Sequence, residues 1–303
     1  MLDVSIFLGQ LFNGLSSASI LLMMALGLAV VFGLMGVINM AHGELMTAGA
    51  YMAYVTQQLF AHYLPAWQSA DFIVALPLSF AVAAVLGLVL EVALIRHLYG
   101  RPLETLLATW GVSLILQQAY RSIFGSNNVS VNTPDWLQSG VKVTADLQLP
   151  YVRLFILALM VLTLLGVYLY LFRTRTGLMI RAAMQNRAIS ACCGVPTRRI
   201  DALTFALGSG LAGLAGCALS LIGSIGPTTG QNYIVDAFMV VVVGGVGKLA
   251  GALAGALAIG ELQSAFEFFT SATAGKILIF ALIIIFLQLR PAGFFPSKSR
   301  ALD

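Results

Sequence analysis

The chain is a succession of long apolar stretches separated by short polar or basic segments. Most of the stretches approach the roughly 20 residues that a helix needs to cross the hydrocarbon core of a bilayer. They lie near residues 6–37, 45–60, 72–95, 104–124, 151–172, 201–223, 233–247, 250–269 and 274–289. This pattern predicts one all-α polytopic membrane domain over residues 1–303, with about nine transmembrane helices and a range of eight to ten.

The composition supports this class. Of the 303 residues, 59% are hydrophobic and 9% are charged, which excludes an ordinary soluble domain. The 30 glycines fit helices that pack closely in lipid. The start, Met1-Leu2-Asp3, lacks a basic region and a cleavage pattern, so we expect the first stretch to remain a span. Cys192, Cys193 and Cys217 lack ligand-spaced partners and are expected to be reduced or buried thiols.

The basic residues predict the orientation, because loops rich in Lys and Arg stay cytoplasmic. With nine crossings and an external N-terminus, twelve of the sixteen Lys and Arg residues lie inside. The four that lie outside are Arg121, Lys142, Arg153 and Lys276. We therefore predict an external N-terminus and a cytoplasmic C-terminus. The net charge of +4 then follows from membrane topology, and no nucleic-acid partner is expected.

Two segments between the apolar stretches are long enough to have roles of their own. Residues 125–150 are polar and predict an external loop, in which residues 129–132 alternate like a short strand. Residues 173–200 carry six arginines and no acidic residue. Within them an apolar stripe predicts a short amphipathic helix on the inner face: Ile180, Met184, Ala188 and Ala191. Gly194 and Pro196 end it. The alternatives are a docking helix and a basic loop on anionic lipid.

A polar hexapeptide, Asn39-Met40-Ala41-His42-Gly43-Glu44, follows the first apolar stretch. A charged side chain at mid-membrane costs about 2.5 to 3.5 kcal/mol on insertion scales, so these groups must face protein, water or a solute. Gly36 and Gly43 mark residues 36–44 as the place where a long helix breaks most easily. Broken helices are where transporters place solutes. The hexapeptide thus predicts a solute pathway, and the alternative is that His42 and Glu44 form a structural pair near the inner interface.

A second glycine cluster at residues 244–248 predicts another break or a re-entrant turn. Two sets of small residues at i+4 spacing follow helix faces and predict close helix packing: Gly247, Gly251 and Gly255 in one, and Gly208, Ala212, Gly216 and Ser220 in the other. Each glycine cluster precedes a helix rich in small residues, one near either end of the chain. This arrangement indicates an internal repeat in opposed halves.

Polar residues on one predicted helix also line a single face. Thr105, Thr109 and Ser113 are spaced at i+4, and Trp110, Ser113 and Gln117 share a helical face. Such a stripe either binds a small polar solute or ties two helices together. Our candidate residues for the substrate pathway are Asn39, His42, Glu44, Thr109 and Gln117.

Enzymatic motifs fail on spacing. His42-Gly43-Glu44 is not the H-E-x-x-H of a zinc helix. Ser209 lacks the G-x-S-x-G context of a nucleophile elbow, and Gly247-Lys248 lacks the rest of a phosphate loop. We therefore expect a non-catalytic chain that holds no metal or cofactor, and any nucleotide chemistry must reside on another chain. A passive channel and an intramembrane hydrolase that uses Ser209 are the other classes.

Residues 33–44, followed by Gly49-Ala50-Tyr51, resemble the signature of inner-membrane permeases of branched-chain-amino-acid-type ABC importers. Three further stretches, residues 101–111, 114–118 and 201–213, resemble the UrtB-type permeases of urea importers within that family. The resemblance covers nearly the whole chain. It implies import of urea across the bacterial inner membrane, and the alternatives are import of branched-chain or other small amino acids and a passive urea or amide channel.

The resemblance also implies partners. These are a homologous second permease subunit, two cytoplasmic ATPases that hold ATP and Mg, an extracytoplasmic urea-binding protein and membrane lipid. Residues 181–194 would be the coupling segment that sits in a groove of an ATPase. The residues expected to couple are Arg181, Ala182, Ala183, Met184, Arg187, Ala188 and Gly194. Arg181 stands where many importers have the Glu of an E-A-A pattern.

Overall fold

The computed structural model describes residues 4–144 and 147–295, which are mostly helical. The α-helices of this part are α1 (Val4–Met35), α2 (His42–Tyr63), α3 (Asp71–Ala93), α4 (Pro102–Phe124), α5 (Tyr151–Arg173), α6 (Arg175–Gln185), α7 (Arg187–Cys192), α8 (Thr197–Leu219), α9 (Thr229–Gly244), α10 (Leu249–Phe269) and α11 (Ala272–Leu289). Short 3-10 turns cover Pro65–Ala70, Ile95–His97 and Asp135–Leu137. Lys298 and Arg300, two of the predicted inner basic residues, lie outside the described residues.

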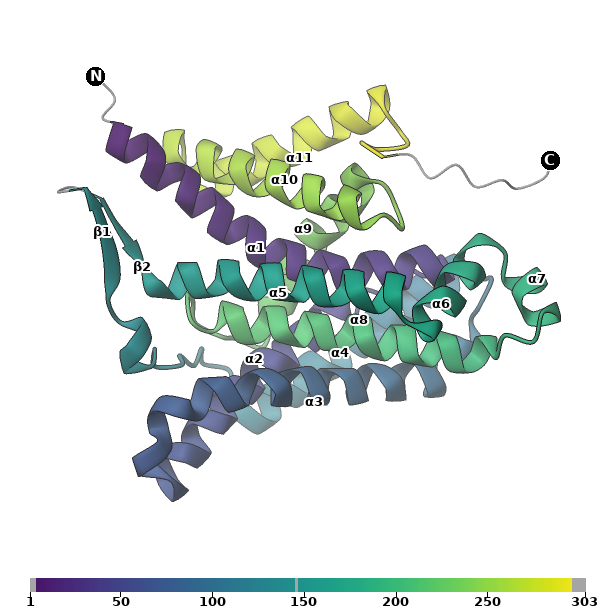
Figure 1. Cartoon of the computed structure of the whole chain (residues 1–303), viewed down its shortest axis with the longest axis horizontal. Coiled ribbons are helices and arrows are strands. Elements are labelled where there is room, and N and C mark those ends of the chain that lie inside the picture. Colours follow the sequence, from purple (N-terminus) through teal and green to yellow (C-terminus); the bar gives the residue numbers. More distant parts are fainter. Residues whose placement is uncertain (1–3, 145–146, 296–303) are drawn as a thin grey trace.

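The long helices lie side by side along the long axis of the molecule (Figure 1). α1 and α8 form the middle of the bundle, because 83% and 72% of their most apolar windows are buried. α5 and α11 are buried over only 22% and 17% of theirs. In water such exposed apolar helices would aggregate, but in a bilayer they face lipid. The burial pattern is that of a membrane-embedded bundle.

Among the described residues, six helices are long and apolar enough to cross a membrane: α1, α3, α5, α8, α10 and α11. Three of the predicted spans, those at α2, α4 and α9, are too polar or too short to qualify. The predicted total of about nine crossings and the orientation of the termini therefore stay predictions. α6 and α7 lie at the opposite end of the bundle from β1 and β2 (Figure 1).

Glycines allow the central helices to touch backbone to backbone. A Cβ added at Gly208 of α8 would lie 2.7 Å from the Gly27 carbonyl oxygen of α1. One added at Gly216 would lie 2.8 Å from the Met46 carbonyl carbon of α2. Gly251 and Gly255 of α10 pack in the same way against α9. Small residues at these crossings bring the helices close enough for dispersion forces to hold them in lipid.

Gly247 does not belong to this α10 face, contrary to prediction. It precedes α10 in the turn after α9 and has a φ of +78°. The second glycine cluster is thus a turn between two helices, and glycine supplies the left-handed backbone that the turn requires.

The loop of residues 125–150 contains a hairpin in place of the predicted strand at residues 129–132. β1 (Gly140–Thr144) pairs antiparallel with β2 (Leu147–Pro150), with Gly140 opposite Pro150. Val129 makes only an isolated bridge to Ile225. The backbone of Asn132 bonds to the Gln57 side chain, with both N to O distances at 2.9 Å. Because these backbone groups are engaged with distant elements, residues 129–132 do not pair as a strand with a neighbour.

Candidate functional site

The chain breaks between α1 and α2, as the glycines at residues 36–44 predict. α1 ends at Met35, Gly36 has a φ of +62°, and α2 begins at His42. The Nε2 atom of His42 lies 3.3 Å from the carbonyl oxygen of Met24, which is eleven residues (35 − 24) before the end of α1. At 1.5 Å per residue, α2 therefore begins about 16 Å back along α1. Residues 36–41 return the chain from the end of the bundle into its interior.

The returning segment is fastened to α4. The Asn39 side chain is fully buried, and its Oδ1 atom accepts a hydrogen bond from the backbone N of Ala41 at 3.0 Å. The backbone N of Met40 donates to Thr109 Oγ1 of α4 at 3.1 Å. Thr109 itself donates to carbonyl groups of its own helix. A single threonine thus fixes the non-helical segment against α4.

Glu44 is the centre of the site. Its Oε1 atom accepts hydrogen bonds from Ser113 Oγ at 3.0 Å and from Gln117 Nε2 at 2.9 Å, both on α4. Gln117 Nε2 also lies 3.5 Å from Gln231 Oε1 of α9. The hydroxyl of Tyr120 donates to the Glu44 carbonyl at 2.8 Å. α2, α4 and α9 therefore meet at one buried polar cluster, which we call the Glu44 site.

Close backbone packing positions α9 at this site. A Cβ added at Gly43 would lie 2.7 Å from the Gly230 carbonyl carbon, so only glycine fits. The backbone N of Gly230 donates to Thr47 Oγ1 at 2.8 Å. α2, α4 and α9 are the three predicted spans that fail the apolarity or length test, and their polar side chains converge here. In α2 and α4, which are long enough to span, the polar residues that build the site are among those that lower the hydropathy, whereas α9 fails on length.

Several buried polar atoms of the hexapeptide have no hydrogen-bond partner among the described residues: Asn39 Nδ2, His42 Nδ1 and Glu44 Oε2. Buried polar groups are almost always paired with protein or water. Lone atoms of this kind are scattered elsewhere in the bundle, but here three come from one hexapeptide. The Glu44 site therefore keeps one unpaired acceptor, Glu44 Oε2, and the hexapeptide around it keeps further unpaired atoms at Asn39 and His42.

Of the five predicted pathway residues, Glu44 and Gln117 bond directly and Asn39 and Thr109 hold the adjoining segment, whereas His42 faces α1. His42 and Glu44 do not pair, because side chains two residues apart on a helix point about 160° apart, to nearly opposite sides. His42 contacts α1 and Glu44 contacts α4. Trp110 lies at the edge of the polar stripe and is 48% exposed, so it does not share the buried face of Ser113 and Gln117. Sequence patterns gave no signal for Gln231, because its partner is 114 residues away.

The predicted coupling segment is two helices and not one. Asn186 separates α6 from α7, and its Oδ1 atom caps α7 by accepting from the backbone N of Ile189 at 3.0 Å. Ile180 is buried, but Ala188 and Ala191 are exposed, so the predicted continuous apolar stripe is wrong. An asparagine cap starts a new helix axis and turns the stripe away from the bundle. Gly194, with a φ of +82°, follows the end of α7 as predicted.

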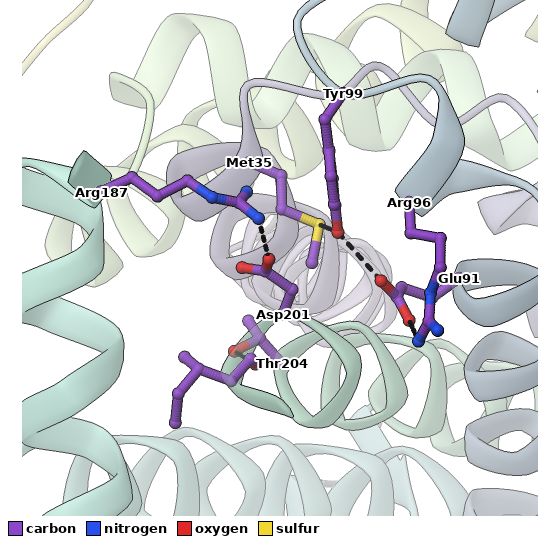
Figure 2. Close-up of polar contacts among 8 residues, drawn as sticks. Met35, Glu91, Arg96, Tyr99, Arg187, Asp201 and Thr204 are labelled. Carbon is purple, nitrogen blue, oxygen red and sulfur yellow. Dashed lines mark hydrogen bonds and ion pairs between the residues drawn. The ribbon is translucent and has the colours of Figure 1, made fainter. Parts of the chain in front are cut away.

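A second polar cluster lies where α7 meets the bundle (Figure 2). Arg187 forms an ion pair with Asp201 of α8, and its guanidinium lies 4.5 Å from the centroid of the Tyr99 ring. The Tyr99 hydroxyl donates to Glu91 Oε1 at 3.1 Å, and Glu91 Oε2 pairs with Arg96 at 3.1 Å. Burial, with the Asp201 and Glu91 carboxylates, raises the pKa of Tyr99 above its usual range, so the phenol stays a donor. We call these five residues the Arg187 cluster.

A bundle of apolar helices that buries a cluster of polar side chains with unpaired atoms is the architecture of a multi-pass membrane transport protein. The chain belongs to the family described as the permease component of branched-chain amino acid transport systems, whose model matches residues 10–287. It is therefore an ABC-type permease subunit. Membership in this family also indicates a non-catalytic membrane component that works with other permease, ATPase and binding-protein subunits.

Individual relatives cover nearly the full length. The branched-chain amino acid permease BraD of Pseudomonas aeruginosa is 29% identical over 297 residues, which are 97% of each chain. LivH of Escherichia coli K12, named as a permease of the same kind, is 28% identical over 95% of this chain and 94% of its own. The ribose import permease RbsC of E. coli K12 is 26% identical over 92% of this chain and 84% of its own. No solved structure matches the chain.

Proposed function

We propose that the chain is the transmembrane permease subunit of an ATP-driven importer for branched-chain or other small amino acids. The observation that carries this proposal is the full-length similarity to permeases that are named for branched-chain amino acids. Import by this route uses a homologous second permease, two cytoplasmic ATPases and an extracytoplasmic binding protein. ATP and Mg remain on the ATPases, and the complex resides in the bacterial inner membrane.

The chemistry of the Glu44 site fits an amino acid. A zwitterion needs an acceptor for its ammonium group and a positive partner for its carboxylate. Glu44 Oε2 is buried and unpartnered, and no cation pairs with Glu44 within the part of the chain described. α9 begins beside it at Thr229, and a helix N-terminus carries partial positive charge. Together they supply both partners within one site.

Urea is the second candidate solute. It is neutral, with four N–H donors and one carbonyl acceptor, so it suits a site that offers amides and hydroxyls. Gln117 and Ser113 are neutral, and Asn39 Nδ2 is an unused donor that suits a carbonyl oxygen. The resemblance of residues 101–111 to urea permeases favours the same solute. Urea import stays a prediction, and the named relatives favour amino acids.

α6 and α7 are the proposed contact with an ATPase. α6 and α7 lie at one end of the bundle (Figure 1). They carry basic residues, and two of their apolar side chains, Leu178 and Ile189, are each 60% exposed. A hollow of about 300 Å³ runs between the two helices, lined by Ala182, Gln185, Asn186, Ile189, Ser190, Cys193 and Val195. Exposed apolar side chains beside a groove are typical of a protein interface. The guanidinium of Arg181 lies over the Phe172 ring, so that residue anchors α6 to α5.

The test is ATP hydrolysis by the assembled complex in proteoliposomes, with the binding protein outside. Leucine and urea are titrated separately, and uptake of each labelled solute is measured in the same vesicles. Stimulation by leucine alone supports the proposal, and stimulation by urea alone transfers it to the second candidate. Indifference to both in an intact complex contradicts both. Uptake that persists without ATP would indicate a passive channel.

A further inference from the structure

Two side chains from the proposed coupling segment reach the last turn of α1. The first is Met184 on α6. A Cβ added at Gly33 of α1 would lie 2.8 Å from Met184 Cε, and one added at Gly247 would lie 3.2 Å from it. The methyl group therefore sits in a slot between α1 and the α9–α10 turn that exists only because both positions are glycine.

The second contact runs from Arg187 on α7 through the Tyr99 ring. The Tyr99 hydroxyl lies 3.6 Å from Sδ of Met35, the last residue of α1 (Figure 2). Both contacts thus end within three residues of Gly36, where the non-helical segment begins. The two paths are independent, since one is apolar and starts on α6 and the other is polar and starts on α7.

Burial makes the polar contact rigid. The side chains of Asp201 and Glu91 are each 1% exposed, while those of their arginine partners lie closer to the surface. Separating Arg187 from Asp201 would leave a buried charge without a partner, which is strongly unfavourable. Arg187 therefore stays paired with Asp201 when α7 moves, and the Tyr99 ring that packs on its guanidinium is displaced with it.

We propose that Met184 and Arg187 are positioning residues that carry displacements of α6 and α7 to the end of α1, and through residues 36–41 to the Glu44 site. Arg187 acts inside the chain and not on the surface of the ATPase. The inference rests on the proposed function only for the statement that ATPases move α6 and α7, and it is independent of which solute is carried.

Met40 is the natural reporter, because its backbone bond to Thr109 must shift if residues 36–41 move against α4. The exposed Cys192 and Cys193 are replaced by serine, the buried Cys217 is kept, and Met40→Cys is introduced. The alkylation rate of this thiol by a maleimide is measured in the full complex without nucleotide and with ATP plus vanadate. We expect the rate to differ at least about threefold between the two states, a coupling of roughly 0.6 kcal/mol.

Two variants test the paths. Arg187→Lys keeps a charge for Asp201 but loses the planar stack on Tyr99, and Met184→Ala empties the glycine slot. Each should reduce the nucleotide-dependent change in rate to less than half, and the double variant should abolish it. The matched control is Arg198→Lys, the same change on an exposed arginine at the start of α8, which should leave the change intact.

Co-purification of the ATPases checks assembly. If Arg187→Lys does not assemble, Tyr99→Phe removes the hydroxyl contacts while keeping the ring and takes its place, and Met184→Leu replaces Met184→Ala. The proposal is overturned if the parent shows no nucleotide-dependent change, or if the variants keep the full change in assembled complexes. Because the assay contains no solute, a complex that ignores leucine and urea but shows the labelling change contradicts the proposed function and leaves this inference standing.

Discussion

The Glu44 site and the Arg187 cluster are both buried and both polar, but they differ in how their charges are balanced. In the Arg187 cluster, Arg187 faces Asp201 and Arg96 faces Glu91. Among the residues that the structure describes, Glu44 faces only neutral donors and keeps one oxygen without a partner. A buried ion pair fixes geometry, whereas an unsatisfied buried group leaves a place for something that is not part of the chain. The comparison separates a mechanical joint from a binding site.

Replacing Glu44 by Gln should have the largest effect on transport. The amide keeps the shape but removes the charge that an ammonium group would meet, which is worth about 2 kcal/mol or roughly 30-fold in affinity. Leucine uptake by the reconstituted complex should fall by about that factor, without loss of thermal stability. If urea is the solute, the fall should be much smaller. Unchanged leucine uptake in a complex that transports leucine would remove Glu44 from the pathway.

Replacing Asp201 by Asn should have the opposite signature, with a large loss of stability. It leaves the Arg187 guanidinium without its carboxylate, and because Arg187 is partly exposed we expect about 2 kcal/mol of destabilisation. Thermal denaturation of the purified complex in detergent measures this. Glu104→Gln, which breaks the exposed pair of Arg101 and Glu104, is the control and should leave the midpoint unchanged. If Asp201→Asn and Glu104→Gln denatured at the same temperature, the Arg187 cluster would not be a mechanical joint.

Thr109→Val should give an intermediate effect on transport. Valine keeps the shape but removes the acceptor that holds the backbone of Met40, a loss of about 1 kcal/mol and roughly fivefold in uptake. Ser122→Ala removes an exposed hydroxyl from the same helix and serves as the control. A fall in uptake equal to that of the control would mean that Thr109 does not fix residues 36–41.

Trp110→Phe should have the smallest effect. The ring lies at the edge of the polar stripe, 48% exposed, on the side where α4 presents apolar residues. Uptake should change by less than about twofold, because an aromatic side chain facing lipid is replaced by another. A loss as large as that of Glu44→Gln would show that the solute path extends to this side of α4.

Much of the fold was predictable from local pattern. The lengths of the apolar stretches predicted where the long helices lie. A chain segment that crosses lipid finds no water, so it must satisfy its backbone hydrogen bonds internally, as a helix does. Gly36 predicted the break, since glycine is the residue that takes up a positive φ without strain. The i+4 spacing of Thr105, Thr109 and Ser113 predicted a shared face, and all three are buried, as is Gln117 one turn further on.

What could not be predicted depends on partners far away in the sequence. In the sequence pattern the apolar stripe continues across Asn186, and only the capping geometry shows that α6 and α7 are separate helices. Arg187 looked like one more basic residue of a cytoplasmic loop, and its contacts with Tyr99 and Asp201 turn it inward. Gln231 belongs to the Glu44 site because α9 begins beside Gly43, a contact that no local sequence pattern indicates. Tertiary contacts, and not local propensity, assigned these residues.

The short reach of α2 also makes this part of the fold depend on particular side chains. Because α2 begins about 16 Å back along α1, residues 36–41 occupy part of the bundle without the hydrogen bonds that a helix supplies. Asn39 Oδ1 and Thr109 Oγ1 accept from the backbone N of Ala41 and of Met40 instead. A polar-to-apolar substitution at either position would therefore leave a backbone amide unpaired inside the bundle.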